Sequence, residues 1–265
     1  MTTQPIVFVS HGGGPLPLLN DPSHTDMLRV FERLKLELTD NPERPRALLF
    51  VSAHWEADPV ALTSAAQPSL LYDYYGFPPE SYALSYPVAG APELAETIQQ
   101  RLSQHGIASQ LDSQRGLDHG VFVPALLLFP EANIPCLQLS LHPNLDPNLH
   151  LQIGAALSEL AADGVMIIGS GYSFHNMRAF FGPADGEGDA LNQGFENWLD
   201  NALASDNAVQ QLAQWQQAPG ARYCPPREEH LMPLLVCVGA ASKHQLAVSW
   251  RFNALGKQGS CYLWR

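Results

Sequence analysis

Two short apolar stretches that each end in a histidine constrain the fold of this chain more than any other feature. Residues 6–10, Ile-Val-Phe-Val-Ser, run into His11 and then break at three glycines, and residues 47–53 form a similar run that ends at His54. Apolar runs of this length with turn residues after them predict buried strands. In open α/β sheets, ligands bind beyond the carboxyl ends of the strands, so both imidazoles are placed to share a metal ion.

A third apolar run repeats the arrangement. Residues 165–169 predict a strand, and a glycine-bearing turn then leads to His175. A histidine considered alone is more often a surface or hydrogen-bonded residue than a ligand. Three histidines that each follow a strand at a turn therefore indicate a metal site.

Two further histidines accompany apolar segments of a different kind. His119 precedes residues 121–129, where Pro124 favours the start of a helix over a central strand. His230 lies in the first turn of a helix predicted over residues 231–241, beside two glutamates, and its alternative interpretation is an exposed helix cap. We interpret the remaining five histidines as surface or structural residues: His24, His105, His142, His150 and His244.

Between these motifs, strand and helix patterns alternate along the chain. Helical spacing of apolar residues, or a proline that opens a helix, predicts helices over residues 26–38, 92–102, 149–162, 189–203 and 208–216. Further strands are predicted over residues 60–64, 107–111, 136–141, 245–252 and 260–264. This alternation predicts an α/β fold with a central, mostly parallel sheet flanked by helices. No repeat or linker is found, so residues 1–265 are expected to form a single domain.

One long segment without periodicity interrupts the alternation. Residues 70–87 contain five tyrosines and a phenylalanine, together with three prolines. Long loops in compact domains are often functional. This aromatic segment is therefore a candidate wall of a binding site, with surface packing as the alternative.

The composition limits the classes of partner and the compartment. The formal charge is −12, and no cluster of Lys and Arg offers the footprint that nucleic acid requires. No apolar run approaches the ~20 residues of a membrane span, and the start of the chain lacks the features of a signal peptide. Four scattered cysteines without paired spacing are typical of reduced core thiols, so a cytoplasmic protein is expected.

Two glycine motifs do not match the chemistry that such motifs often carry. The glycines at 12–14 are followed by Pro15, which fits neither a dinucleotide fingerprint nor a P-loop. Gly169-Ser170-Gly171 lacks the spacing of a nucleophile elbow, so a serine hydrolase has little support.

Five motifs occur in an order that resembles a known family. They are Ser10-His11-Gly12-Gly13-Gly14-Pro15, Ser52-Ala53-His54-Trp55, Leu117-Asp118-His119-Gly120, Ser173-Phe174-His175-Asn176 and Glu229-His230-Leu231-Met232-Pro233-Leu234. Together they resemble the DOPA-dioxygenase-type branch of the class III (LigB-like) extradiol ring-cleaving dioxygenases. The resemblance spans nearly the whole chain, and it implies a LigB-like α/β catalytic domain.

The resemblance also implies a ligand set. The metal would be held by His11, His54 and His230, with His175 as a fourth ligand or as a base. Protocatechuate-cleaving relatives complete their iron site with a carboxylate, whereas this chain places His230 at that position. An all-imidazole set suits Zn(II) as well as Fe(II), so either ion is expected as the bound divalent metal.

The reaction that this resemblance implies is the insertion of both atoms of O2 into a catechol, DOPA-like or another dihydroxyphenyl compound, to give a muconic semialdehyde. Zinc has no redox chemistry, so this activity requires Fe(II). His175 is expected to remove a hydroxyl proton as a general base, and His119 to donate a hydrogen bond to oxygen or substrate.

Two alternatives stay open at the level of the sequence. A zinc-dependent hydrolase would use a metal-bound water, with His175 as the proton shuttle. A non-catalytic metal-binding protein of the Memo type would act through partners, although the complete histidine set and the aromatic segment argue against it. The sequence leaves open which catechol is cleaved, at which bond, and in which oligomeric state.

Overall fold

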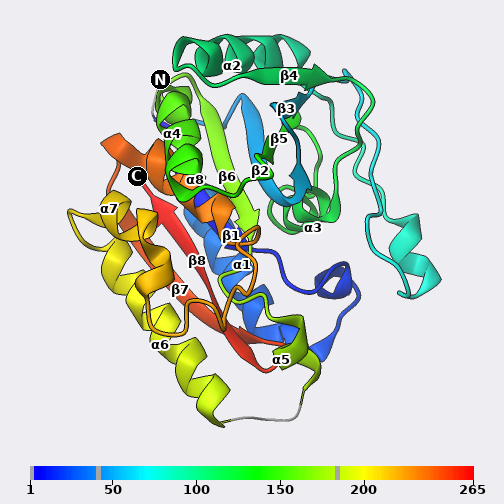
Figure 1. Cartoon of the computed structure of the whole chain (residues 1–265). Helices are drawn as coiled ribbons and strands as arrows, with labels where there is room; N and C mark the ends of the chain where they lie inside the picture. Colours follow the sequence, from blue (N-terminus) through cyan, green and yellow to red (C-terminus); the bar gives the residue numbers. More distant parts are fainter. Residues whose placement is uncertain (1–2, 40–42, 183–185) are drawn as a thin grey trace.

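The apolar runs predicted as strands form the middle of an eight-stranded sheet (Figure 1). The structure is a computed structural model and describes residues 3–39, 43–182 and 186–265. Its strands are β1 Ile6–Ser10, β2 Ala47–Glu56, β3 Val60–Thr63, β4 Ser109–Asp112, β5 Cys136–Leu141, β6 Val165–Gly171, β7 Leu246–Ala254 and β8 Lys257–Trp264. Its α-helices are α1 Thr25–Thr39, α2 Pro92–Gln104, α3 His119–Leu128, α4 Pro147–Leu157, α5 Met177–Phe181, α6 Gly186–Leu203, α7 Ala208–Ala213 and α8 Met232–Ala240.

The sheet order places the histidine-bearing strand ends side by side. The strands lie in the order β4-β3-β5-β2-β6-β1-β8-β7, and the four central strands β5, β2, β6 and β1 are all parallel. Strand β3 runs antiparallel to β5, and β8 and β7 form an antiparallel edge. Because β1, β2 and β6 share one direction, their carboxyl ends meet at one edge of the sheet, as the sequence predicted.

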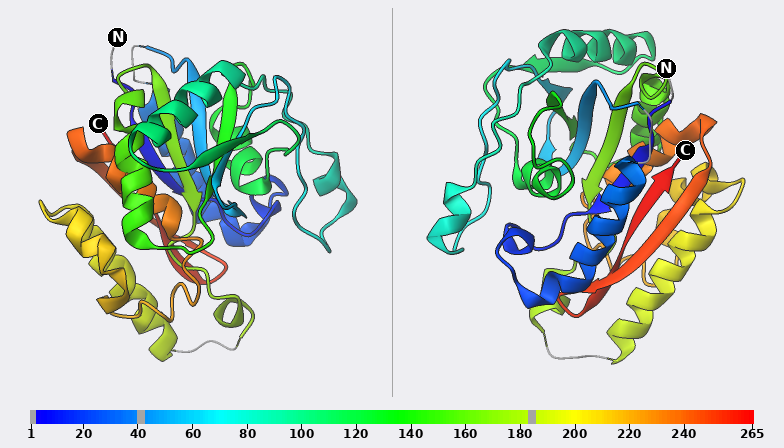
Figure 2. Two further views of the ribbon diagram at one scale, coloured as in Figure 1. Left: turned by 45° about the horizontal axis from the view of Figure 1, so that its top comes forward. Right: turned by 180° about the vertical axis from the view of Figure 1, so that it is seen from behind.

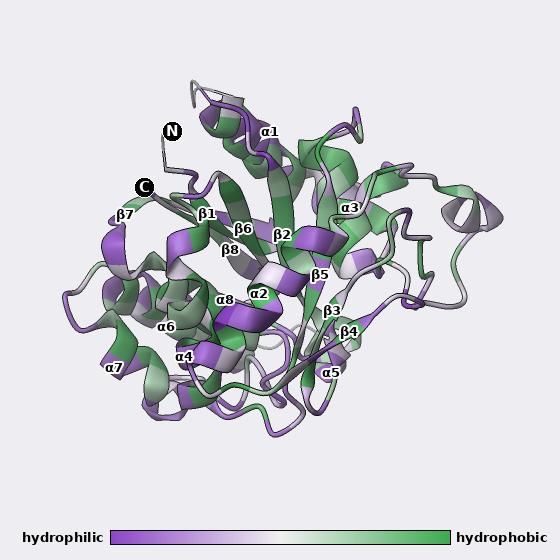
Figure 3. Ribbon diagram, turned by 90° about the horizontal axis from the view of Figure 1, so that it is seen from above, coloured by the Kyte–Doolittle hydropathy of each residue, from purple (hydrophilic) through white to green (hydrophobic). Residues whose placement is uncertain are grey.

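Helices cover both faces of this sheet, which confirms the predicted α/β class. Helices α1 and α3 lie on one face, in front in the rear view of Figure 2. Helices α4, α6, α7 and α8 cover the other face, with α2 packed beside α4 (Figure 1). Seen from above, the central strands are hydrophobic and the outer helices carry the hydrophilic residues (Figure 3).

The core explains why the central strands are buried along their whole length rather than on one face only. Every residue of β1, β5 and β6 is buried, as expected for strands covered on both faces. Helix α8 is buried along its whole length between α4 and the sheet. All four cysteines are free and buried, in agreement with reduced core thiols. None of the described helices is long and apolar enough to cross a membrane.

Several predicted boundaries differ from the structure. Helix α3 begins at His119 rather than Val121, so Pro124 lies inside the helix, where its missing N–H leaves the carbonyl of Gly120 without its helical partner. Helix α8 begins at Met232, so His230 lies in the turn before the helix and not in its first turn. The helix predicted over 149–162 tightens into a 3-10 turn after Leu157.

Candidate metal centre

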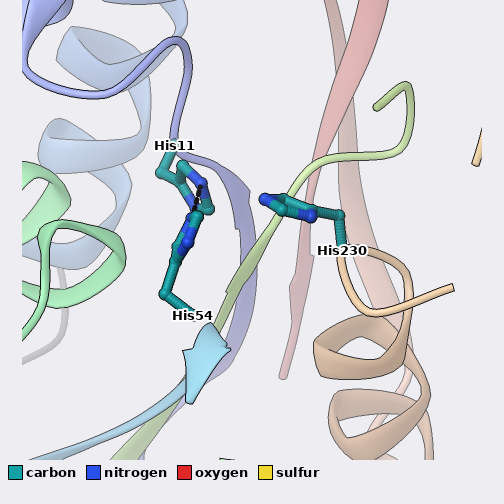
Figure 4. Close-up of side chains that lie close together, drawn as sticks. All are labelled: His11, His54 and His230. Carbon is teal, nitrogen blue, oxygen red and sulfur yellow. Dashed lines mark hydrogen bonds between the residues drawn. The ribbon is translucent and has the colours of Figure 1, made fainter. Parts of the chain in front are cut away.

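Three of the predicted histidines converge at the carboxyl edge of the sheet. His11 follows β1 directly, His54 lies near the end of β2, and His230 precedes α8. One ring nitrogen of each lies within 4.8 Å of the others, so the three could hold a metal ion. Figure 4 shows the three imidazoles pointing toward a common centre.

The geometry of these rings suits a shared ion. The Nε2 atoms of His11 and His54 are 3.0 Å apart. Two nitrogens at that separation can each lie about 2.0–2.1 Å from one divalent ion. Two of the other ring nitrogens have hydrogen-bonding partners in the protein, because His11 Nδ1 lies 3.0 Å from Ser170 Oγ and His230 Nδ1 lies 2.9 Å from Glu229 Oε1. Such contacts orient imidazole ligands toward a metal.

Burial keeps these imidazoles neutral. Desolvation, followed by the neighbouring imidazoles, holds the pKa of His11 and of His230 well below the ordinary value. The same burial, followed by the charge of His119, lowers the pKa of His54 to about 3. Neutral imidazoles offer free lone pairs at neutral pH, so a metal would not have to displace protons. Three neutral imidazoles suit Fe(II) or Zn(II).

Backbone contacts around Gly171 fix the positions of two of these histidines. The N–H of His11 donates to the carbonyl of Gly171, and the N–H of Tyr172 donates to the carbonyl of His230. A Cβ at Gly171 would lie only 2.0 Å from the carbonyl oxygen of His230. Strand β6 therefore ends in glycine because the turn that carries His230 passes directly against it.

The glycine-rich turn after β1 is fixed in a similar way. Gly12 has a φ of +84°, a conformation that favours glycine. The N–H of Gly13 donates to Nε2 of His24, a buried side chain. His24 is thus structural, as the sequence suggested, and it anchors the turn beside His11.

His175 lies beside the three convergent imidazoles. Its ring stacks on that of His230 with centroids 3.4 Å apart and planes at 14°. Its Nδ1 lies 3.4 Å from Glu229 Oε1. Among the described residues, no group of potential ligands joins His175 to His11 and His54.

Glu229 has a role in the site that the sequence interpretation missed. We considered it part of an exposed helix cap, but His230 is only 3% exposed and Glu229 contacts the rings of both His175 and His230. Burial alone would raise the pKa of Glu229, yet the hydrogen bonds to His175 and the backbone, together with the charges of His175 and Arg227, outweigh burial and the pKa is lowered. The carboxylate stays charged between two imidazoles.

His119 has a carboxylate partner of its own, which sequence reasoning also missed. Asp73 Oδ1 lies 2.7 Å from His119 Nδ1 and accepts a further hydrogen bond from the His119 N–H. Burial raises the pKa of Asp73, but these hydrogen bonds and the charges of His119 and His54 together lower it further than burial raises it. Since a charged carboxylate only accepts, Nδ1 carries the proton and Nε2 keeps its lone pair. Because Asp73 and His119 are 46 residues apart, the spacing of residues in the sequence could not show that they are in contact.

The histidines line a cavity of about 340 Å³. The aromatic segment supplies Tyr74 and Phe77 to its wall, so the predicted role of this segment as a wall holds for these two residues. Tyr75 is instead 92% exposed and Tyr86 is buried in the core. The other lining residues are His11, Gly12, Gly13, Gly14, Leu16, His54, His119, Tyr172, His175, Met177, Phe180, Phe181, His230 and Leu255.

Comparison with known proteins assigns the family. A family model described as the catalytic LigB subunit of aromatic ring-opening dioxygenase matches residues 5–261. The chain belongs to the LigB family. This confirms the resemblance drawn from the five motifs, and it agrees with the metal-dependence of LigB dioxygenases, since the site described above could hold a metal ion.

The relatives of this LigB protein include named dioxygenases. "Dioxygenase tasH" of Hapsidospora irregularis is 40% identical over 100% of this chain and 86% of that protein. "4,5-DOPA dioxygenase extradiol" of Beta vulgaris is 36% identical over 91% of this chain and 88% of that protein, and the Escherichia coli K12 protein of the same name is 31% identical over 90% and 86%. The crystal structure of the uncharacterized protein JW3007 from Escherichia coli K12 superposes with a TM-score of 0.77 at 26% identity, covering 98% of this chain and 99% of that one.

Proposed function

We propose that this LigB protein is an extradiol dioxygenase that opens the ring of a catechol, inserts both atoms of O2 and releases a muconic semialdehyde. One observation carries the proposal. Three neutral, inward-pointing imidazoles meet at a cavity whose wall holds two more imidazoles, His119 beside Asp73 and His175 beside Glu229. Relatives named as extradiol dioxygenases support the same class of reaction.

The proposed metal ligands are His11, His54 and His230, and the proposed metal is Fe(II). Bound iron would pass electron density between a catecholate and O2, which redox-inert zinc cannot do. The Ser170 hydroxyl and the Glu229 carboxylate would hold two of the ligand rings in the orientation that the metal needs.

His175 is proposed as the general base. It lines the cavity outside the convergent set, where it can take a proton from a catechol hydroxyl. Glu229 Oε1, 3.4 Å from His175 Nδ1, would stabilise the imidazolium that results. This arrangement supports a base rather than a fourth ligand.

His119 is proposed to hold the second hydroxyl group. Asp73 keeps the Nδ1 proton in place, so Nε2 is free to accept a hydrogen bond from the substrate. After Nε2 has taken that proton, it becomes a donor toward the reacting oxygen. Tyr74 and Phe77 would pack against the aromatic ring and exclude water from it.

The first experiment reloads metal-free protein anaerobically with Fe(II) or Zn(II) and adds a panel of catechols, including DOPA and protocatechuate. Oxygen uptake and absorbance of the yellow semialdehyde are followed together. We expect both signals with iron and neither with zinc. Absence of uptake with both metals would reject the proposal and favour a zinc-dependent hydrolase or a non-catalytic metal-binding protein.

Substitutions distinguish the proposed metal ligands from the proposed base, because loss of a ligand lowers the metal content and loss of the base lowers turnover alone. His175→Gln is expected to abolish turnover while the iron content measured by elemental analysis falls little. His11→Ala and His54→Ala are expected to lose the metal itself. Loss of iron from His175→Gln as well would make His175 primarily a ligand.

We also propose that the enzyme works in the cytoplasm. Its four buried free thiols are typical of a reducing compartment.

A further inference from the structure

A second, more open cleft adjoins the metal cavity. Its volume is about 830 Å³, and it shares His175 and Met177 with the cavity. Helix α5 supplies Met177 and Arg178 to its wall, and the segment before α8 supplies Arg222, Arg227 and Glu229. A ring substituent of a bound catechol that extends out of the metal cavity beside His175 would therefore lie in this cleft.

The cleft gathers cationic side chains on a protein that is acidic as a whole. The protein has 26 acidic and 14 basic residues, yet four cations line this cleft, Arg178, Arg222, Arg227 and Lys257, and Glu229 is the acidic residue in its wall. Whether such a cleft attracts an anion depends on which of these cations lacks a carboxylate partner.

Three of these four cations are already paired with carboxylates. Arg222 contacts Glu228 at 2.8 Å, and Lys257 contacts Asp189 at 2.5 Å. Arg227 binds both carboxylate oxygens of Glu56, at 2.6 and 2.8 Å.

The fourth cation, Arg178, is exposed and has no carboxylate within ion-pair distance in the described parts of the chain. Its guanidinium is therefore available to a ligand.

The metal cavity itself offers no place for a charged substituent. Its lining consists of imidazoles, glycines and apolar or aromatic side chains, without a Lys, Arg, Asp or Glu among the described residues. A carboxylate that points away from the metal, against the apolar and aromatic wall, would lose its hydration without a cationic side chain to compensate. A ring bound in the cavity would consequently direct an anionic side chain outward, to the cleft.

We propose that the cleft is a carboxylate subsite and that Arg178 determines specificity for catechols that carry an acidic side chain. The proposal rests on the proposed function, because the catechol ring is what places the side chain at His175. The planar guanidinium suits a carboxylate, with which it forms two parallel hydrogen bonds.

The test is equilibrium binding by calorimetry under anaerobic conditions, on Zn(II)-loaded protein so that no turnover occurs. The two probes are 3-(3,4-dihydroxyphenyl)propionate and its primary amide, which differ in the charge of the side chain. We expect the wild type to bind the carboxylate on the order of tenfold more tightly than the amide, and Arg178→Gln to bring that ratio to about one. Arg33→Gln removes an exposed arginine on α1 and should keep the wild-type ratio.

A charge reversal sharpens the test. Arg178→Glu should favour 3,4-dihydroxyphenethylamine over the carboxylate. Equal binding of carboxylate and amide to the wild type, or an equal change in Arg178→Gln and Arg33→Gln, would overturn the subsite while leaving the dioxygenase proposal intact. Binding of neither catechol would overturn both.

Discussion

At the scale of single residues, the candidate centre depends on pairs in which a second group contacts the far nitrogen of an imidazole. Ser170 contacts His11, Asp73 contacts His119, and Glu229 contacts His230. Each contact fixes a ring orientation, and a carboxylate partner also fixes the tautomer. The two carboxylates are thus expected to affect chemistry without being ligands.

Asp73→Asn tests this at His119. The amide keeps an acceptor for Nδ1 but removes the charge, so kcat is expected to fall about 10- to 100-fold while iron content is unchanged. Stopped-flow absorbance and elemental analysis measure the two quantities. Asp206→Asn, at an exposed aspartate that makes no ion pair with the described residues, should match the wild type. An unchanged kcat in Asp73→Asn would show that the charge of Asp73 does not contribute to catalysis through His119.

At the scale of elements, the close approach between the end of β6 and the turn before α8 sets where His230 lies. Gly171→Ala would place a methyl group 2.0 Å from the His230 carbonyl, and the carbonyl belongs to the backbone and cannot rotate away. We expect a loss of about 1–3 kcal/mol in unfolding free energy together with weaker metal binding.

Denaturant unfolding and metal titration measure both effects of Gly171→Ala. Gly194→Ala is the matched control, because its Cβ would meet only a Pro219 side-chain atom at 3.4 Å and it lies inside α6. There the same substitution should stabilise the protein by about 0.5–1 kcal/mol. Equal stability losses in the two variants would contradict the role of Gly171.

The aromatic segment carries a second prediction at this scale. Tyr74 lines the cavity and its ring lies 5.7 Å from that of His119. Tyr74→Ala is expected to raise KM for a catechol up to about tenfold, since an aromatic pair contributes about 0.5–1.5 kcal/mol. Tyr75→Ala removes the neighbouring ring, which is 92% exposed, and should leave KM as it is. Steady-state oxygen uptake gives KM for the wild type and for both variants. Equal KM values in all three proteins would exclude the segment from substrate binding.

At the scale of the whole molecule, a buried network joins α6 to the strands that carry the site. Glu196 is fully buried and accepts a hydrogen bond from Ser260 on β8. The Ser260 carbonyl in turn accepts from Ser10, which precedes His11. The Ser260 N–H donates to Ser173, near His175. Burial raises the pKa of Glu196 from its ordinary 4.5 to about 7.

This shift predicts how stability depends on pH. Between pH 4.5 and 7 the folded protein keeps the Glu196 proton and the unfolded chain releases it, so stability falls as pH rises through that range. The difference corresponds to about 3 kcal/mol. The glutamine in Glu196→Gln cannot titrate, so this variant should lose the fall in stability that Glu196 causes. The histidines contribute equally to the pH dependence of the wild type and of the variant, so their contribution cancels in the comparison. Parallel stability curves from urea unfolding at pH 5 to 7.5 would refute the assignment.

The sequence by itself predicted the α/β class, the family and the histidines that the structure brings together at the candidate centre. Each of these depends on local patterns: apolar runs of strand length, turns rich in glycine, and motifs in a recognisable order. The rule that parallel strands present their carboxyl ends at one edge then brings His11 and His54 together without knowledge of the contacts. His230 needed the resemblance, because its local pattern alone also fits an exposed helix cap.

Only the tertiary structure decided which groups contact these histidines. Asp73 and His119 are 46 residues apart, and Glu229 contacts His175 across 54 positions. The sequence pattern shows whether a residue is buried but not which residue it meets, because contacts between segments depend on strand order and helix packing. For the same reason the sequence did not reveal the second cleft, since its cations come from α5, from the segment before α8 and from β8.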